Sequence, residues 1–185
     1  MPDRLNEVSD LTDLIGSWVL HASTSEFFAA HPRVTQGRVT YESSERERVA
    51  FRVELMIRNR TLRIRGRARS SQVGKAHNGR GHGARFIASR MQWRILMSAD
   101  GRILSTGSAA SMMTNAGTLI MARDGVSRAE VLDHIHRRYA EHGLSQPDLR
   151  DMHWREPSDH TTPLPPAART WRGNRLARHR PVIDS

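Results

Sequence analysis

The chain has 185 residues, a formal net charge of +10 at pH 7 and no cysteine, which excludes disulfide bonds and thiolate chemistry. Its apolar runs are too short for a membrane-spanning helix, and its first residues are polar and acidic, unlike a signal peptide. We therefore expect one soluble, cytoplasmic domain of ordinary size.

The positive charge comes almost entirely from arginine, because 28 of the 29 basic residues are arginine and only Lys75 is lysine. A strongly basic chain favours nucleic acid or another anionic surface as a partner. However, many of these arginines alternate along expected strands and do not cluster with stacking aromatic residues, as a single-strand binder would require. The pattern favours a solvated arginine coat and leaves nucleic-acid binding as an alternative.

The first third of the chain predicts one helix and two strands. Residues 1–15 are expected to form a short amphipathic helix. The apolar positions at helical spacing are Leu5, Val8, Leu11 and Ile15. Strands are expected over residues 19–24 and 34–42, separated by a loop or short helix that stops at Pro32.

The stretch from Val49 to Ser71 shows the strongest pattern in the chain. Apolar residues alternate with polar and charged ones on both sides of a break at Asn59-Arg60, as in strands with one dry and one wet face. We expect an antiparallel hairpin that turns at this break. The cross-strand pairs that this turn predicts are Phe51 with Ala68 and Glu54 with Arg65.

The middle of the chain predicts a loop and further strands. Residues 71–83 are rich in glycine and are expected to form a loop. The next segment, Ala84–Ser98, is apolar and β-prone, and it forms either one long strand or two strands that meet near Arg90. The last strands are expected over residues 103–110 and 118–123.

A helix is predicted from Ser127 to His142. Ser127 and Glu130 form a capping-box pattern, and Gly143 is a C-terminal stop signal. The expected buried stripe of this helix is Leu132, Ile135 and Tyr139. From Pro157 onward the chain is rich in proline and arginine, which is typical of an extended segment with little packing of its own.

Together these elements predict a mainly β protein, a single antiparallel up-and-down β-barrel of about eight strands with a short N-terminal helix and one C-terminal helix packed outside. Three segments are expected: a helical segment over residues 1–15, the barrel with its helix over residues 16–145, and a Pro/Arg-rich extension over residues 146–185. A barrel of this size is filled by side chains or encloses one small ligand.

The sequence Gly16-Ser17-Trp18 resembles the Gly-x-Trp motif that opens the first strand of lipocalins and their calycin relatives. In that family the tryptophan closes the barrel floor and an arginine from the last strand lies across it. Arg123 ends the last expected strand and matches that arginine. Residues 10–145 thus resemble a bacterial lipocalin-like domain. The resemblance implies structural roles for Trp18 and Arg123, and binding of a small hydrophobic or amphiphilic molecule.

The same resemblance places two loops at the barrel mouth and the inner faces of the strands around a cavity. The expected ligand-binding residues are Phe27, Phe28, Tyr41, Phe51, Val53, Leu55, Trp93, Met112, Met113 and Asn115. Some lipocalin-like barrels are instead cofactor-free isomerases, cyclases or hydratases. For such chemistry the acid–base candidates are His31 at the rim, then Tyr41 and Glu54, the last of which also faces arginines as a salt-bridge partner.

The histidine spacings do not indicate a metal site. His77 and His82 lie five apart without a nearby carboxylate, and His134 and His136 point to different faces of a helix. We therefore expect neither a metal nor a cofactor. The main hypothesis is a protein that binds a small hydrophobic molecule. The alternatives are a cofactor-free isomerase, cyclase or lyase of a specialised-metabolite pathway, and a nucleic-acid-binding β-barrel.

Overall fold

The structure, a computed structural model, describes residues 5–24, 34–43, 48–57, 60–70, 76–82, 90–108 and 116–155. In chain order the elements are β1 (Asn6–Glu7), the 3-10 helix η1 (Leu11–Leu14), β2 (Gly16–Ser23), β3 (Val34–Ser43), β4 (Arg48–Ile57), β5 (Arg60–Ser70), β6 (His77–His82), β7 (Arg90–Met97), β8 (Ile103–Ser108), β9 (Gly117–Arg123), α2 (Arg128–Arg138), α3 (Gln146–Asp151) and β10 (His153–Trp154).

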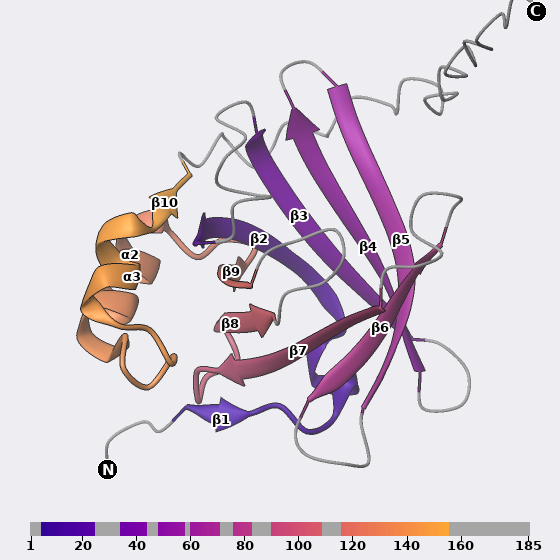
Figure 1. The fold of residues 1–185 in the computed structure, drawn as a ribbon, viewed down its shortest axis with the longest axis horizontal. Helices are drawn as coiled ribbons and strands as arrows, with labels where there is room; N and C mark the ends of the chain where they lie inside the picture. The colour runs from indigo at the N-terminus through magenta and orange to yellow at the C-terminus, as the bar shows by residue number, and fades with distance from the viewer. Residues whose placement is uncertain are drawn as a thin grey trace, which may run out of the picture.

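The strands β2 to β9 form a closed antiparallel barrel (Figure 1). Neighbouring strands follow the order β7-β6-β5-β4-β3-β2-β9-β8, and pairing of β7 with β8 closes the ring. The short strand β1 pairs with β7, and β10 pairs with β2. The helices α2 and α3 pack outside the barrel, beside β2, β8 and β9 (Figure 1). The predicted mainly β, up-and-down barrel is therefore confirmed.

The β4–β5 hairpin forms with a different register from the one predicted. Ile57 pairs with Arg60, so the connection is residues 58–59 instead of Asn59-Arg60. Moving the turn by one residue shifts the register by two, which places Phe51 opposite Gly66 and no longer opposite Ala68. Because a shift of two residues keeps every side chain on its face of the sheet, the predicted inner and outer faces are unchanged.

The glycine-rich segment is partly a strand, so the prediction of a loop over residues 71–83 was wrong for His77–His82. Aromatic rings lie directly against the backbone of β6 and of its neighbour β5 at glycine positions. A Cβ atom on Gly79 of β6 would stand 2.1 Å from the ring of Trp93, and one on Gly66 of β5 would stand 2.2 Å from the ring of Phe51. In the segment expected as one or two strands, Arg90–Met97 forms β7, while residues 84–89 lie outside the described residues.

The N-terminal segment contains less helix than predicted. Within residues 5–15 only Leu11–Leu14 is helical, as one 3-10 turn whose first donor, the Thr12 amide, binds the Asp10 carboxylate at 2.8 Å. In a 3-10 helix, side chains three apart lie on the same side, so Leu11 and Leu14 both face inward and are buried. Ile15, which the helical spacing placed on the apolar stripe, is instead 41% exposed.

The helix after the barrel was predicted correctly in place, and its predicted buried stripe was right at Ile135 but missed Val131. The Ser127 hydroxyl accepts a hydrogen bond from the Glu130 amide at 3.2 Å and starts α2. The fully buried positions are Val131 and Ile135, four residues apart, while Leu132 is partly exposed. The helix also ends at Arg138, four residues before the predicted end.

Two elements after α2 were not predicted. Ser145 and Asp148 form a complete capping box that starts α3, with the Ser145 amide donating to the Asp148 carboxylate at 2.7 Å. The chain then returns to the barrel, where Trp154 of β10 pairs with Ala22 of β2. Residues 146–155, expected as the start of an extension, therefore pack on the barrel, and residues 156–185 lie outside the described residues.

The core has two parts, one on each side of the barrel wall. The interior cluster consists of Val8, Leu11, Leu14, Trp18, Leu20, Val39, Tyr41, Val49, Phe51, Ala68, Ile95, Leu104 and Met121. The outer cluster, between the barrel and the helices, consists of Ala22, Ile103, Ile120, Ala122, Val126, Val131, Ile135, Leu144 and Met152. A register shift in β2 between Leu20 and Ala22 lets that strand contribute to both clusters.

Candidate ligand-binding site in the barrel

The end of the barrel near η1 is closed by Trp18 and Arg123. Trp18 has no exposed surface, and its indole N–H donates to the carbonyl of Leu14 at 2.8 Å. The guanidinium carbon of Arg123 stands 3.9 Å from the Trp18 ring centroid, a cation–π contact. The guanidinium also donates to the carbonyls of Ile15 at 2.8 Å and Asp13 at 3.2 Å. The tryptophan–arginine closure predicted from the Gly-x-Trp motif is present.

The glycine of the motif has a steric role. Gly16 has φ +117°, a conformation that residues with a Cβ atom rarely adopt. A Cβ atom at this position would lie 2.5 Å from the Arg123 Nη1 atom. Gly16 therefore lets the arginine reach across Trp18. Burial lowers the pKa of Arg123, yet the carbonyl acceptors and the ring face stabilise its charge.

Five of the predicted ligand-binding residues lie on the inner face of the barrel. They are Tyr41 on β3, Phe51, Val53 and Leu55 on β4, and Trp93 on β7. Tyr41, Phe51 and Leu55 are buried, while Val53 and Trp93 are partly exposed and pack against the interior cluster. Phe51 and Trp93 meet edge to face with ring centroids 5.9 Å apart. Trp93 thus meets Phe51 from a strand that is distant in sequence.

The other predicted ligand residues, Phe27, Phe28, Met112, Met113 and Asn115, lie outside the described residues, as does His31. The strands that flank them can still be placed. β2 ends at Ser23 and β3 begins at Val34, while β8 ends at Ser108 and β9 begins at Gly117. These four strand ends lie at the same end of the barrel, because β2 pairs with both β3 and β9 and all the pairs are antiparallel. That end is opposite the Trp18–Arg123 closure.

The two remaining acid–base candidates lie on opposite sides of the wall. Tyr41 is inside, and burial raises the pKa of its hydroxyl. Glu54 is outside, where its carboxylate accepts a hydrogen bond from Arg63 at 2.6 Å. The predicted partner Arg65 was wrong by two residues, since Arg63 is the residue opposite Glu54. The structure therefore does not bring Tyr41 and Glu54 to a common site.

Sequence reasoning missed the polar residue His77 on the inner face of the barrel. This side chain is 1% exposed, and its Nε2 atom lies 2.8 Å from the carbonyl oxygen of Val8. Burial lowers the pKa of His77, which favours the neutral ring. The missed signal is the period-two order of His77, Gly79 and Gly81, which share the inner face of β6 opposite β7.

Outside the barrel, a second polar group lies beneath α2. The Nδ1 atom of His142 lies 2.8 Å from the Ser105 hydroxyl, and its Nε2 atom lies 3.1 Å from the Nε2 atom of His134. Burial lowers the pKa of His142 to about 4. The exposed His136 points away, as the helical spacing predicted. Within the described ranges, no cluster of three or more His, Asp or Glu side chains could hold a metal ion.

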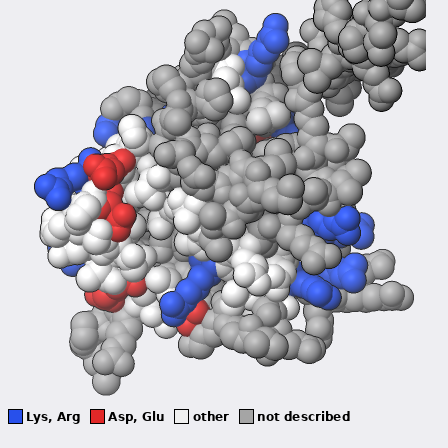
Figure 2. All heavy atoms as spheres, viewed as in Figure 1, with Lys and Arg blue, Asp and Glu red and all other residues white. Residues whose placement is uncertain are grey.

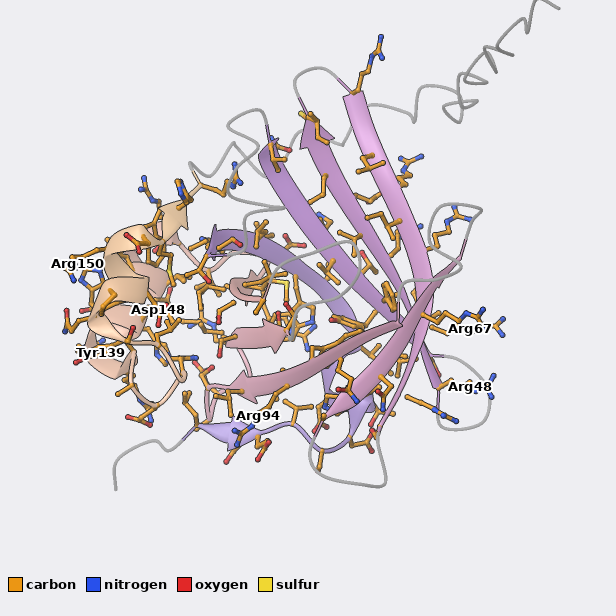
Figure 3. The ribbon with its side chains drawn as sticks, viewed as in Figure 1. Arg48, Arg67, Arg94, Tyr139, Asp148 and Arg150 are labelled. Atoms are coloured by element: carbon orange, nitrogen blue, oxygen red, sulfur yellow. The ribbon has the colours of Figure 1, made fainter. Side chains whose placement is uncertain are left out.

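The outer face of β4 and β5 carries a basic surface, which we define as Arg48, Arg65, Arg67 and Arg69. All four side chains are exposed. Arg48 and Arg67 project from the same side of the barrel (Figure 3). In Figure 2 the basic atoms at this edge have no acidic neighbour among the described atoms of the visible face. None of the four forms an ion pair with another described residue, whereas the nearby Arg63 and Arg52 do.

Solved structures with the same architecture define the class of fold. The siderocalin Ex-FABP, which functions through dual ligand specificities, matches with TM-score 0.58 at 10% identity, covering 80% of this chain and 97% of that one. Insecticyanin from the tobacco hornworm Manduca sexta matches with TM-score 0.62 at 12% identity, covering 85% and 86%. Apocrustacyanin C2 matches with TM-score 0.56 at 9% identity, covering 80% and 79%.

These three proteins are lipocalins, so the chain has the lipocalin, or calycin, fold that its Gly-x-Trp motif predicted. At the level of sequence, no family model and no curated protein matches the chain. In the part of the chain that the structure describes, no helix has the length and apolar character needed to cross a membrane.

Proposed function

We propose that this protein binds a small hydrophobic or amphiphilic molecule inside the barrel, as a lipocalin-like binding domain of bacterial type. The observation that carries the proposal is a difference in exposure among the inward-facing side chains. Near the closure, Leu14, Trp18 and Leu104 have no exposed surface. Val53 and Leu119, also packed on the interior cluster, keep partial exposure. An interior that is closed at one end and still accessible along its wall suits a guest molecule.

The chemistry of the interior supports an apolar ligand. The described inward-facing side chains are mainly aliphatic and aromatic, and their polar atoms are few. Apolar pockets with a small number of polar groups are typical of sites for small molecules, in which the polar groups orient the ligand. The lipocalin fold of the chain agrees with this proposal.

The proposal can be tested by filling the interior. Val53→Trp adds a large side chain on the inner face of β4, and we expect binding of an apolar fluorescent dye to weaken at least tenfold. The matched control is Gln92→Trp, because Gln92 is exposed on the outer face of β7. Native mass spectrometry of the protein from its own host should show a bound hydrophobic molecule. Equal dye binding by the parent and Val53→Trp would contradict the proposal.

A second function, nucleic-acid binding, is favoured by the basic surface. Arg48 stands directly opposite Arg69, and Arg65 stands directly opposite Arg52. Like charges at opposed positions destabilise a sheet, so an anionic partner that neutralises them would gain free energy. Phosphate groups along a nucleic acid provide repeated negative charges of this kind.

This second function predicts a steep dependence on salt. The triple variant Arg65→Ala, Arg67→Ala, Arg69→Ala should bind DNA more weakly, and its salt slope should fall by about 0.9 for each phosphate that the variant no longer neutralises. Arg137→Ala, an exposed arginine on α2, is the control. An electrophoretic shift assay measures both effects. If the parent protein gives no shift at about 50 mM salt, where binding to phosphate is strong, this function is excluded.

A further inference from the structure

Two buried polar atoms on the inner face of the barrel have no hydrogen-bond partner among the described residues. One is Nδ1 of His77 on β6, and the other is Nε1 of Trp93 on β7. The two residues are direct cross-strand partners in the antiparallel β6–β7 pair. Side chains at such positions have Cβ atoms about 4.5–5.5 Å apart, so the two residues are direct neighbours on the inner face.

The hydrogen-bonding state of His77 follows from its other contact. Its Nε2 atom lies 2.8 Å from the carbonyl oxygen of Val8, and a carbonyl can only accept. Nε2 therefore carries the proton and donates it. In the neutral ring Nδ1 is then a bare acceptor, and it is buried in a side chain that is 1% exposed.

Trp93 presents the complementary atom. An indole N–H can only donate, so the buried Nε1 of Trp93 is a donor that meets no acceptor within the described part of the chain. The ring is held in place because it lies over Gly79, where a Cβ atom would be 2.1 Å away, and meets Phe51 edge to face. Trp93 therefore cannot swing toward another acceptor without displacing these neighbours.

The two atoms together define the group that would satisfy them. It must accept from the Trp93 N–H and donate to Nδ1 of His77. A hydroxyl does both. A carboxylate cannot donate, and it would be buried between two uncharged groups. The cation at the closed end of the barrel does not offset this cost, since the Arg123 guanidinium is engaged by the Trp18 ring and two backbone carbonyls.

We propose that the barrel binds an apolar molecule carrying a neutral hydroxyl group, and that His77 and Trp93 hold this hydroxyl. The inference rests on the proposed binding function and adds the chemical class of the ligand. Occupancy of both atoms would explain why a histidine and a tryptophan face each other on a mainly apolar wall. Unpaired buried polar atoms are uncommon in folded proteins, and a ligand or an ordered water usually accounts for them.

The experiment compares three probes that have the same chain length but different head groups: 1-decanol, 1-methoxynonane and decanoate. Binding is measured by calorimetry or by displacement of an apolar dye. Decanol accepts and donates, the ether only accepts, and decanoate is charged. We expect decanol to bind about five- to tenfold more tightly than the ether, which corresponds to one net hydrogen bond. Decanoate should bind more weakly than decanol.

Two variants assign the preference to the proposed atoms. Trp93→Phe removes the donor and keeps an aromatic ring, and His77→Phe removes the acceptor. In each variant the preference for decanol over the ether should fall to within twofold. Because His77 also binds Val8, thermal melts must confirm that His77→Phe is folded, and Trp93→Phe tests the site if it is not. His136→Phe, at an exposed position on α2, is the control and should keep the preference.

The outcomes separate this inference from the function on which it rests. Equal binding of decanol and the ether by the parent protein would overturn the hydroxyl site, and an ordered water would then account for the two atoms. Tighter binding of decanoate would overturn it as well. In both cases binding inside the barrel would stand. If none of the three probes binds, the hydroxyl site and the proposed function both fail.

Discussion

Trp18 is the residue on which the closed end of the barrel depends. Its ring is fully buried, its N–H binds the Leu14 carbonyl, and Arg123 covers it. Trp18→Ala should lower the free energy of unfolding by about 3–5 kcal/mol, as large aromatic deletions in cores do. Arg123→Ala should cost less, because it removes a cation–π contact of about 0.5–2 kcal/mol and leaves a smaller void. Urea denaturation measures both. An unchanged midpoint for Trp18→Ala would contradict the role of the motif.

Gly79 shows why an inner wall with large aromatic rings needs glycine. Gly79→Ala would place a methyl group against the Trp93 ring, and we expect a loss of about 1–3 kcal/mol of unfolding free energy from overpacking. Gly107→Ala is the matched control, because a Cβ atom there meets no described atom within 4 Å. Near-UV circular dichroism should report the displaced indole ring in the first variant only. Equal stability of the two variants would mean that Trp93 does not lie over β6.

At the scale of elements, the strands and faces of the β4–β5 hairpin were predictable from the sequence, but its register was not. Alternation of apolar and charged residues identified both strands and both faces. The turn lacks an Asn-Gly or Asp-Gly pair, so local sequence did not determine its position. Pairing with β3 and β6 on the two sides of the hairpin constrains the register in the closed barrel. Glu54 consequently pairs with Arg63 and not with Arg65.

The docking of α2 should depend on pH through His142. Its pKa is lowered to about 4 in the folded state, so above its unfolded value of about 6.5 both states are neutral. Between about pH 6.5 and 4 the unfolded chain binds the proton and the folded chain does not. Stability should therefore fall as the pH drops through this window, by up to about 3 kcal/mol. Burial is the main cause of the lowered pKa of His142, and the positive charges of His134 and Arg138 lower it further, whereas Glu141 raises it. At His134 the Asp100 carboxylate likewise raises the pKa.

Urea denaturation at pH 7.5 and pH 5 tests this dependence. The loss of stability on acidification should be smaller in His142→Phe than in the parent protein, because that variant lacks the group that titrates. His136→Phe, at an exposed position of the same helix, should keep the parent slope. A His142→Phe slope equal to that of the parent would show that the buried His142 does not govern the pH dependence.

At the scale of the molecule, β2, β8 and β9 carry apolar side chains on both faces, toward the interior cluster and toward the outer cluster. The two clusters should therefore unfold together. Ile135→Ala should lower the unfolding free energy by about 2–5 kcal/mol, because Ile135 is fully buried in the outer cluster. Leu132→Ala, on the same helix but partly exposed, should cost clearly less. Near-UV and far-UV circular dichroism should give coincident transitions. A separate transition for the helices would contradict one cooperative unit.

The sequence by itself determined the class of fold and the closed end. Period-two alternation needs no knowledge of partners, because it depends only on one face of a strand being dry. The same is true of the capped start of α2 at Ser127, where the contacts are local. The Gly16–Trp18 motif and Arg123 identified which end of the barrel is closed. The inner positions of Tyr41, Phe51, Val53, Leu55 and Trp93 followed from alternation alone.

Only the tertiary structure decided where non-local partners meet. Gly79 and Gly81 are typical of a loop until the Trp93 ring is known to lie over their strand, and this packing joins residues on different strands. The position of His77 in the candidate site also depends on a non-local contact, because its hydrogen bond with Val8 joins distant parts of the chain. The buried stripe of α2 follows from the packing of Val131 and Ile135 in the outer cluster. Such features depend on how strands and helices pack in space, which the pattern of a single strand or helix does not contain.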